Sequence, residues 1–180
     1  MRSVLSTFFT FALATIISIS ITIGSAVPAF AQPTTATLPG LAGKFTGTRP
    51  DNIGVTEGHL AGCPTTPNCV VSQGADADHA IPPIFYEGDR TIARANILNI
   101  LSVVPRTEVV EQTDDYILAQ SESRLMGFVD DTEFYFPADE KVVQVRAAAR
   151  MGESDLGVNR RRIEQIRLAF NDLTKRTAAQ

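Results

Sequence analysis

The sequence lacks the short motifs that identify several common enzyme classes, and it has few residues that serve as general bases. It contains no Gly-x-Ser-x-Gly nucleophile elbow, no His-Glu-x-x-His zinc motif and no glycine-rich phosphate loop. Only two histidines occur among its 180 residues, His59 and His79, and neither lies in a recognisable triad pattern. These absences argue against the hydrolase, metalloprotease and nucleotide-binding classes that such motifs mark.

Long apolar runs are missing beyond the first 31 residues. Arg2 precedes a largely apolar stretch over residues 8–23, and residues 29–31 (Ala-Phe-Ala) form a small-x-small cleavage pattern. This order predicts a signal peptide over residues 1–31, cut before Gln32, and therefore an exported protein. An uncleaved N-terminal anchor is the alternative. Nothing later is apolar for long enough to cross a bilayer, so we expect no transmembrane segment in the mature chain.

An excess of positive charge is also missing. Because Arg2 is the only charged residue of the first 31, the mature chain keeps 15 basic and 20 acidic residues, a net charge of −5. An acidic chain is a poor candidate for nucleic-acid binding, so we expect no nucleic-acid partner. Anionic lipid surfaces would also repel it, unless its basic helix is presented to them locally.

Cysteine is limited to Cys63 and Cys69, in the run Cys-Pro-Thr-Thr-Pro-Asn-Cys. An even pair at this spacing, in an exported chain, predicts a structural disulfide that closes a small loop. Free thiols are one alternative. A redox-active pair normally has closer spacing at a helix start, and a zinc site would need more ligands than the two histidines supply. We expect no metal and no cofactor.

The mature chain divides into a turn-rich first part and a regular second part. Residues 32–43 are rich in Thr, Pro, Ala and Gly and predict a flexible leader, and residues 44–84 show many turn-formers without a sustained period. The apolar pattern then predicts a helix from the Asp89 cap to Pro105, strands over 107–113, 116–122, 128–136 and 142–150, and a last helix over about 157–175.

This element order predicts an α+β fold. Three or four strands form an antiparallel meander, both helices cover one face of the sheet, and a long loop-rich segment precedes them. We expect one domain over residues 44–176.

The hairpin between the last two strands decides which charged side chains meet. A four-residue loop over 137–140 would place Asp131 opposite Arg146 and Asp130 opposite Ala147. Neighbouring residues of a strand point to opposite faces, so Asp130 and Asp131 cannot share one site. Asp131 and Arg146 then form a solvated cross-strand pair in the simplest interpretation.

Asp130 shares its face with apolar side chains such as Phe134, so it needs a hydrogen-bond donor or a cation. The first turn of the last helix is the expected source, and Asp130 would then lock this helix onto the sheet. The functional alternative is a ligand pocket at the same junction, lined by Asp130, Arg150, Asp155, Asn159 and Arg160.

A second group of acidic residues points to a different chemistry. Asp131 and Glu133 share a face that could hold a hard cation such as Ca²⁺, although Arg146 would neutralise Asp131 without a metal. With His79 they are the residues that a hydrolase or metal-dependent enzyme would use. His79 follows Asp76 in a turn, however, and we expect it to anchor that loop.

Several segments of the chain, in order, resemble the domain of unknown function 1499 family, and cyanobacterial members in particular. They are Arg49-Pro50, Leu60-Ala61-Gly62-Cys63-Pro64, Pro67-Asn68-Cys69-Val70-Val71-Ser72-Gln73, His79-Ala80-Ile81-Pro82-Pro83, Met126-Gly127-Phe128-Val129-Asp130-Asp131, Glu133-Phe134 and residues 150–164. Such proteins often carry Ser-Ser where this chain has Val71-Ser72. The resemblance runs from about Lys44 to Phe170. It implies a fold and an address in the periplasm or thylakoid lumen, and it implies no catalytic residue.

Three functions are therefore considered. The expected one is a binding or assembly module that contacts a protein complex or a small anionic ligand, because Arg160, Arg161 and Arg162 cluster at a helix start. A solvated helical face is the plainer interpretation of that cluster. The alternative is a hydrolase or metal-dependent enzyme using Asp131, Glu133 and His79. The third is a scaffold whose long loop docks on a partner.

Overall fold

The computed structural model describes residues 43–178. The predicted signal peptide over 1–31 and all but the last residue of the predicted leader over 32–43 lie outside this range. The described part contains, in order, β1 (Val55–Thr56), β2 (His59–Leu60), β3 (Cys69–Val71), β4 (Ile84–Phe85), α1 (Arg90–Val103), β5 (Thr107–Gln112), β6 (Tyr116–Glu122), β7 (Val129–Tyr135), β8 (Val142–Ala149) and α2 (Val158–Ala178).

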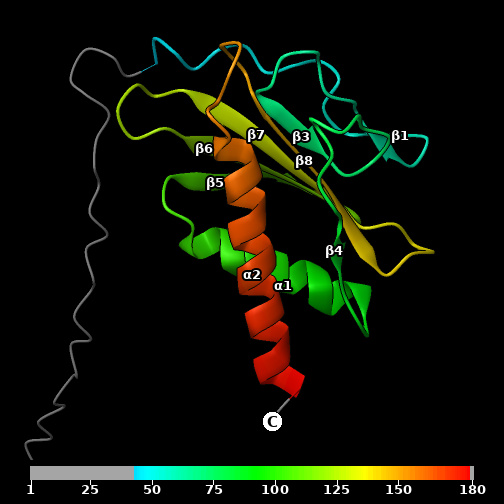
Figure 1. The fold of residues 1–180 in the computed structure, drawn as a ribbon. Coiled ribbons are helices and arrows are strands. Elements are labelled where there is room, and N and C mark those ends of the chain that lie inside the picture. The colour runs from blue at the N-terminus through cyan, green and yellow to red at the C-terminus, as the bar shows by residue number, and fades with distance from the viewer. Residues whose placement is uncertain (1–42, 179–180) are drawn as a thin grey trace, which may run out of the picture. The chain divides into compact units, whose positions relative to one another are not determined.

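The main sheet has the strand order β3-β8-β7-β6-β5, and β4 also pairs with β8 (Figure 1). All of these strand pairs are antiparallel. The predicted meander is therefore confirmed in β5 to β8, and with it the α+β class. The sequence pattern missed β3 and β4, because strands of two or three residues are too short to show an alternating period.

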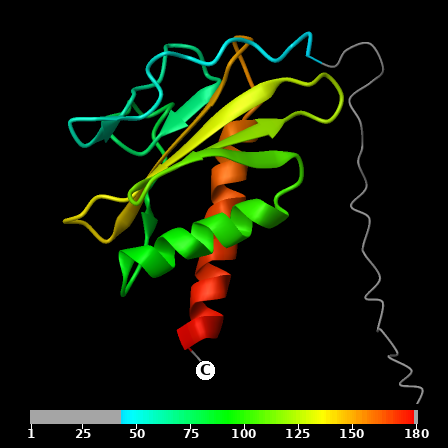
Figure 2. The same ribbon diagram turned by 180° about the vertical axis from the view of Figure 1, so that it is seen from behind.

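Both helices lie on one side of the sheet, as the sequence predicts (Figures 1 and 2). The Asp89 carboxylate caps α1 by accepting from the Thr91 N–H at 2.6 Å. The apolar stripe of α2 packs Ile163, Ile166 and Phe170 into a core shared with α1 and the strands. We call this side of the sheet the helix face. No helix among residues 43–178 is long and apolar enough to cross a membrane.

The chain that precedes β4 covers the opposite side of the sheet, which we call the loop face. There Leu60 and Val71 form a smaller apolar cluster with Tyr116 and Leu118 of β6. Figure 2 shows this segment, in cyan and teal, on the far side of the strands from the helices. The loop-rich segment therefore shields the second side of the sheet from solvent.

The register of the β7–β8 hairpin corrects the predicted one by two residues. Glu133 pairs with Arg146, and Asp131 pairs with Ala148. Because the shift is even, each side chain keeps its predicted face, and Asp130 and Asp131 do point to opposite sides. The predicted Asp131–Arg146 pair is wrong, and so is its predicted exposure, since the two residues are only 1% and 3% exposed.

Candidate functional site

Asp130 connects β7 to the start of α2. Its Oδ2 atom accepts a hydrogen bond from Arg162 Nη2 at 2.7 Å, and Arg162 Nη1 donates to Asn159 Oδ1 at 2.6 Å. Burial raises the pKa of the Asp130 carboxyl, and the neighbouring Arg162 charge opposes that rise. The expected contact between Asp130 and the last helix is present, with Arg162 as its partner in place of Arg160.

The first turn of α2 is capped from the preceding loop. Asp155 accepts from the Gly157 N–H at 2.9 Å and from the Asn159 N–H at 2.7 Å. Gly157 has a φ of +75°, and a Cβ there would come within 3.1 Å of Arg161 Nη1. The carboxylate of Asp155 therefore serves the helix end, where a negative charge is favoured, and the glycine leaves room for an arginine.

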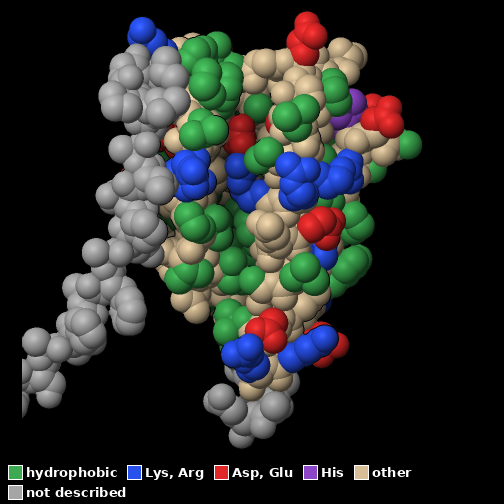
Figure 3. All heavy atoms as spheres, turned by 60° about the vertical axis from the view of Figure 1, so that its left-hand side comes forward, with side chains coloured by type: hydrophobic (Ala, Val, Ile, Leu, Met, Phe, Trp, Pro, Cys, Tyr) green, Lys and Arg blue, Asp and Glu red, His purple; other side chains and the backbone are tan. Residues whose placement is uncertain are grey.

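A cavity of about 390 Å³ opens beside Asp130, between the end of α1, the strands β5 and β6 and the start of α2. We call it the arginine cavity, because its charged lining consists of four arginines and two acidic residues, with a formal charge of +2. These residues are Arg106, Arg124, Arg161, Arg162, Glu122 and Asp130. Figure 3 shows basic side chains in a band across the molecule, with apolar side chains next to them.

Two of these guanidinium groups are oriented by backbone carbonyls. Arg106 Nε donates to the Glu122 carbonyl at 3.0 Å, and Arg161 Nη1 donates to the Leu156 carbonyl at 2.8 Å. A carbonyl acceptor carries no net charge, so these bonds orient the cations without neutralising them. Thr107 and Ser121, whose hydroxyl oxygens lie 2.8 Å apart, also line the cavity. The lining thus offers the cationic and hydroxyl donors that recognise oxyanions.

Only Asp130, of the five residues predicted to line a ligand pocket, lines the arginine cavity. Arg150 lies on the loop face, where Asp131 accepts from its Nε and Nη2 atoms at 2.7 and 2.8 Å. Asp155 caps α2. Asn159 is fully buried and donates to the Asn68 carbonyl at 3.1 Å. The structure therefore does not bring these five side chains together.

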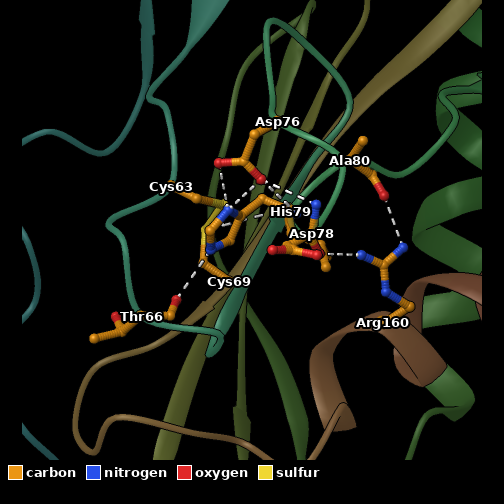
Figure 4. Close-up of polar contacts among 9 residues, drawn as sticks. Cys63, Thr66, Cys69, Asp76, Asp78, His79, Ala80 and Arg160 are labelled. Atoms are coloured by element: carbon orange, nitrogen blue, oxygen red, sulfur yellow. Dashed lines mark hydrogen bonds and ion pairs between the residues drawn. A yellow bond between two sulfur atoms is a disulfide. The ribbon is translucent and has the colours of Figure 1, made fainter.

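Arg160 does not line the cavity and points toward the loop that precedes β4 (Figure 4). Its guanidinium donates to the Ala80 carbonyl at 2.7 Å and to the Asp78 carbonyl at 2.8 Å. The helical period could have identified Arg162 as the partner of Asp130, because Arg162 follows the buried Asn159 by three residues and precedes the buried Ile166 by four. Arg106 and Arg124 had no such signal, since both lie outside regular elements.

The loop face holds a second group of ionisable side chains, and this group is closed to water. Glu133 is fully buried and accepts from Arg146 Nη1 at 2.9 Å, the Tyr116 hydroxyl at 2.9 Å and the Gly54 N–H at 2.8 Å. Burial, followed by the Glu133 charge, raises the pKa of Tyr116. Asp131 and Glu133 therefore share a face as predicted, yet each carboxylate already has its own arginine.

Polar side chains of the loop face also fasten the N-terminal part of the described chain to the sheet. With its amide oxygen turned toward the guanidinium groups, Gln120 accepts from Arg150 and, at 3.0 Å, from Arg49 Nη2. Glu133 holds the backbone at Gly54 in the same way. A shared role in holding residues 49–54 over the loop face accounts for these contacts.

His79 anchors its loop, as the sequence predicts (Figure 4). Nδ1 lies 2.8 and 2.9 Å from the two Asp76 carboxylate oxygens, and Nε2 lies 3.2 Å from the Thr66 carbonyl. The hydrogen bond that His79 Nδ1 donates to the Asp76 carboxylate is the main reason that the pKa of His79 is raised, and the Thr66 carbonyl adds to it. Both ring nitrogens face acceptors, an arrangement that favours the imidazolium form and suits an anchor better than a general base.

The predicted disulfide between Cys63 and Cys69 is present, with the two Cα atoms 5.6 Å apart. It closes the loop that contains Thr66, the acceptor of His79 Nε2. Asn68, in the same loop, accepts through its carbonyl from Asn159 Nδ2. The disulfide loop thus braces the start of α2, and with it the arginines that line the cavity.

Among residues 43–178, no three His, Cys, Asp or Glu side chains gather in a group that could hold a metal ion. Neither a curated protein nor a solved structure matches the chain. One family model, described as a protein of unknown function (DUF1499), matches residues 59–170. This match spans more than half of the chain and confirms the resemblance that the sequence motifs indicate. The chain belongs to the DUF1499 family of proteins of unknown function.

Proposed function

We propose that this protein is an exported binding module that holds a small anionic ligand in the arginine cavity. One observation carries the proposal. Four arginines surround a cavity of about 390 Å³ and give its charged lining a formal charge of +2, in a mature chain whose net charge is −5. Positive charge concentrated around a concave site in an acidic protein selects for an anion at that place.

The chemistry of the lining suits a phosphate, sulfate or carboxylate group. Guanidinium groups offer planar pairs of N–H donors that match two oxygens of such groups. The hydroxyl groups of Thr107 and Ser121, which hydrogen-bond each other, add polar groups to the lining. Asp130 keeps Arg162 at the cavity wall through its 2.7 Å hydrogen bond, so the protein holds this cation in place before a ligand arrives.

The contacts of the residues named for the alternative enzyme give it no comparable support. Asp131 and Glu133 are each paired with an arginine. Both nitrogens of His79 face acceptors in the loop it anchors. These three side chains therefore do not form one reactive site.

The proposed address is the periplasm or the thylakoid lumen. The apolar N-terminal segment and its cleavage pattern support export, and the Cys63–Cys69 disulfide is typical of an oxidising compartment.

Calorimetric titration with inorganic phosphate and with sulfate tests the binding function. Arg124→Gln combined with Arg161→Gln removes two cations from the lining, and we expect the affinity to fall about ten- to a hundredfold. Arg176→Gln is the matched control, because Arg176 is exposed near the end of α2, where it pairs with Asp172. Equal affinities for the parent protein and the double variant would remove the proposal.

A further inference from the structure

The rim of the arginine cavity carries apolar side chains that the fold leaves in solvent. Leu156 is 84% exposed, Leu125 is 56% exposed and Val158 is 39% exposed. Val158 lines the cavity itself, Leu125 follows the cavity-lining Arg124, and the Leu156 carbonyl accepts from Arg161. Apolar and cationic groups therefore lie close together around this cavity.

Leu156 combines its exposure with an uncommon backbone conformation. Its φ is +54°, in the left-handed region that a branched side chain rarely adopts. Neither burial nor backbone preference explains a leucine there. Arg106, on the cavity lining, has a φ of +53° and shares this feature. Glu57, in the turn between β1 and β2, has a φ of +51°, so this conformation occurs in a turn away from the cavity as well as at two positions beside it.

We propose that the arginine cavity and its rim form a docking surface for a membrane that contains anionic lipids. A phosphate of a lipid headgroup occupies the cavity, and Leu125 and Leu156 enter the boundary between the headgroups and the acyl chains. This inference rests on the proposed anion-binding function, because it identifies the anion as part of a lipid. Apolar side chains next to arginines are what an interfacial binding surface requires.

Charge complementarity favours this occupant and fixes its direction of approach. The mature chain has a net charge of −5, so most of its surface is repelled by an anionic membrane. The charged lining of the arginine cavity has a formal charge of +2 and is attracted to it. A free phosphate would need the arginines alone and would make no contact with the exposed leucines.

The positions of the two leucines distinguish a lipid from an acidic protein as the source of the anion. The two leucines come from different loops, the one between β6 and β7 and the one between β8 and α2. Separate apolar tips around a charged cavity can enter a fluid interface one at a time, whereas protein interfaces bury a continuous apolar centre. The lipid is therefore the occupant to which we commit.

Vesicle flotation of the protein purified after export tests the docking surface. We expect it to float with vesicles that mix phosphatidylglycerol into phosphatidylcholine, not with phosphatidylcholine alone, and to be released by salt. Leu125→Ser combined with Leu156→Ser should lower the vesicle partition coefficient by about tenfold or more, since two leucines no longer leave water. The same variant should bind inorganic phosphate with the parent's affinity.

Two further variants make the outcome decisive. Leu168→Ser removes a leucine of α2 that is 67% exposed and does not line the cavity, so it should change neither readout. Arg124→Gln combined with Arg161→Gln should lower both. All of the substituted side chains are exposed, and a thermal melt shows whether each variant keeps the parent fold.

Each other outcome has a definite meaning. If the leucine variant floats as well as the parent, or if the parent binds phosphate but no vesicle, the lipid inference falls and the anion-binding function stands. Should neither phosphate nor vesicles bind, both fall. If the parent binds an oligoglutamate peptide but no vesicle, the surface is a protein-binding site and the lipid inference is wrong.

Discussion

The two faces of the sheet use the same pairing of carboxylate and arginine under different conditions. On the loop face, Glu133 and Arg146 are 0% and 4% exposed at their side chains and are closed off from water. On the helix face, Asp130 and Arg162 are 10% and 15% exposed and border the arginine cavity. A closed pair can only hold the structure together. A pair that borders a cavity can also meet a ligand, so the position of a charge pair, more than its type, indicates its role.

Breaking the closed pair should give the largest effect. Arg146→Ala leaves Glu133 buried without its cation, and we expect the free energy of unfolding to fall by about 3–5 kcal/mol, as measured by urea denaturation. Glu133→Gln combined with Arg146→Met removes both charges and should restore most of that loss. A fall of less than about 1 kcal/mol in Arg146→Ala would show that the pair behaves like a surface pair.

Breaking the pair at the cavity should give a smaller loss of stability and a gain in binding. Asp130→Asn weakens one charged hydrogen bond, and we expect the free energy of unfolding to fall by about 1.5–3 kcal/mol. The asparagine amide oxygen can still accept from Arg162, so the arginine stays at the cavity wall while the lining loses a negative charge. Phosphate affinity should therefore rise, whereas Glu133→Gln should leave phosphate affinity unchanged. An unchanged melting temperature in Asp130→Asn would contradict the contact between α2 and the sheet, and weaker phosphate binding would contradict the cavity.

The smallest effect on the free energy of unfolding should come from the loop that His79 anchors, and this effect should depend on pH. Asp76 raises the pKa of His79, so the folded protein holds this proton more tightly than the unfolded chain does. The stabilisation is fully present below about pH 6.5, the ordinary histidine pKa, and it is lost as the pH rises through the raised value. Asp76→Asn should flatten this part of a plot of unfolding free energy against pH.

On the acid side of the same plot, the free energy of unfolding should fall as the pH falls. His79 lowers the pKa of Asp76, so the Asp76 contribution is present above about pH 4 and is lost as the pH falls further. The parent and Asp76→Asn should therefore differ most between about pH 4 and 6.5. If the two curves run parallel across this range, the loop anchor has no role in stability.

The sequence predicts the elements of this fold well because their signals are local. The Asp89 cap, the stripe of α2 and the apolar residues of the strands each depend on neighbours in the chain, and the elements that they predict are present in the structure. The register of the β7–β8 hairpin, in contrast, cannot be determined from neighbouring residues alone. A shift of two residues keeps every apolar side chain on its face, so the pattern could not choose between Asp131 and Glu133 as the partner of Arg146.

The site was predicted less completely, since distant parts of the chain build it. Asp130 was found because a charge in an apolar strand needs a partner. The covering of the loop face was missed, because residues 44–84 have no period that would show where they pack. Arg106 and Arg124 reach the cavity from two separate connections, at positions that only the packing of α1 and the strands determines.

The central claim is that the cavity on the helix face binds an anion and that the ion pairs of the loop face serve structure alone. The most direct measurement is an NMR titration of the protein with inorganic phosphate, in which backbone amide shifts are assigned. We predict saturable shifts confined to the amides around Arg106, Arg124 and residues 158–162. Shifts centred on Gly54, Asp131 and Arg150 instead, or no saturable shift at all, would contradict the account.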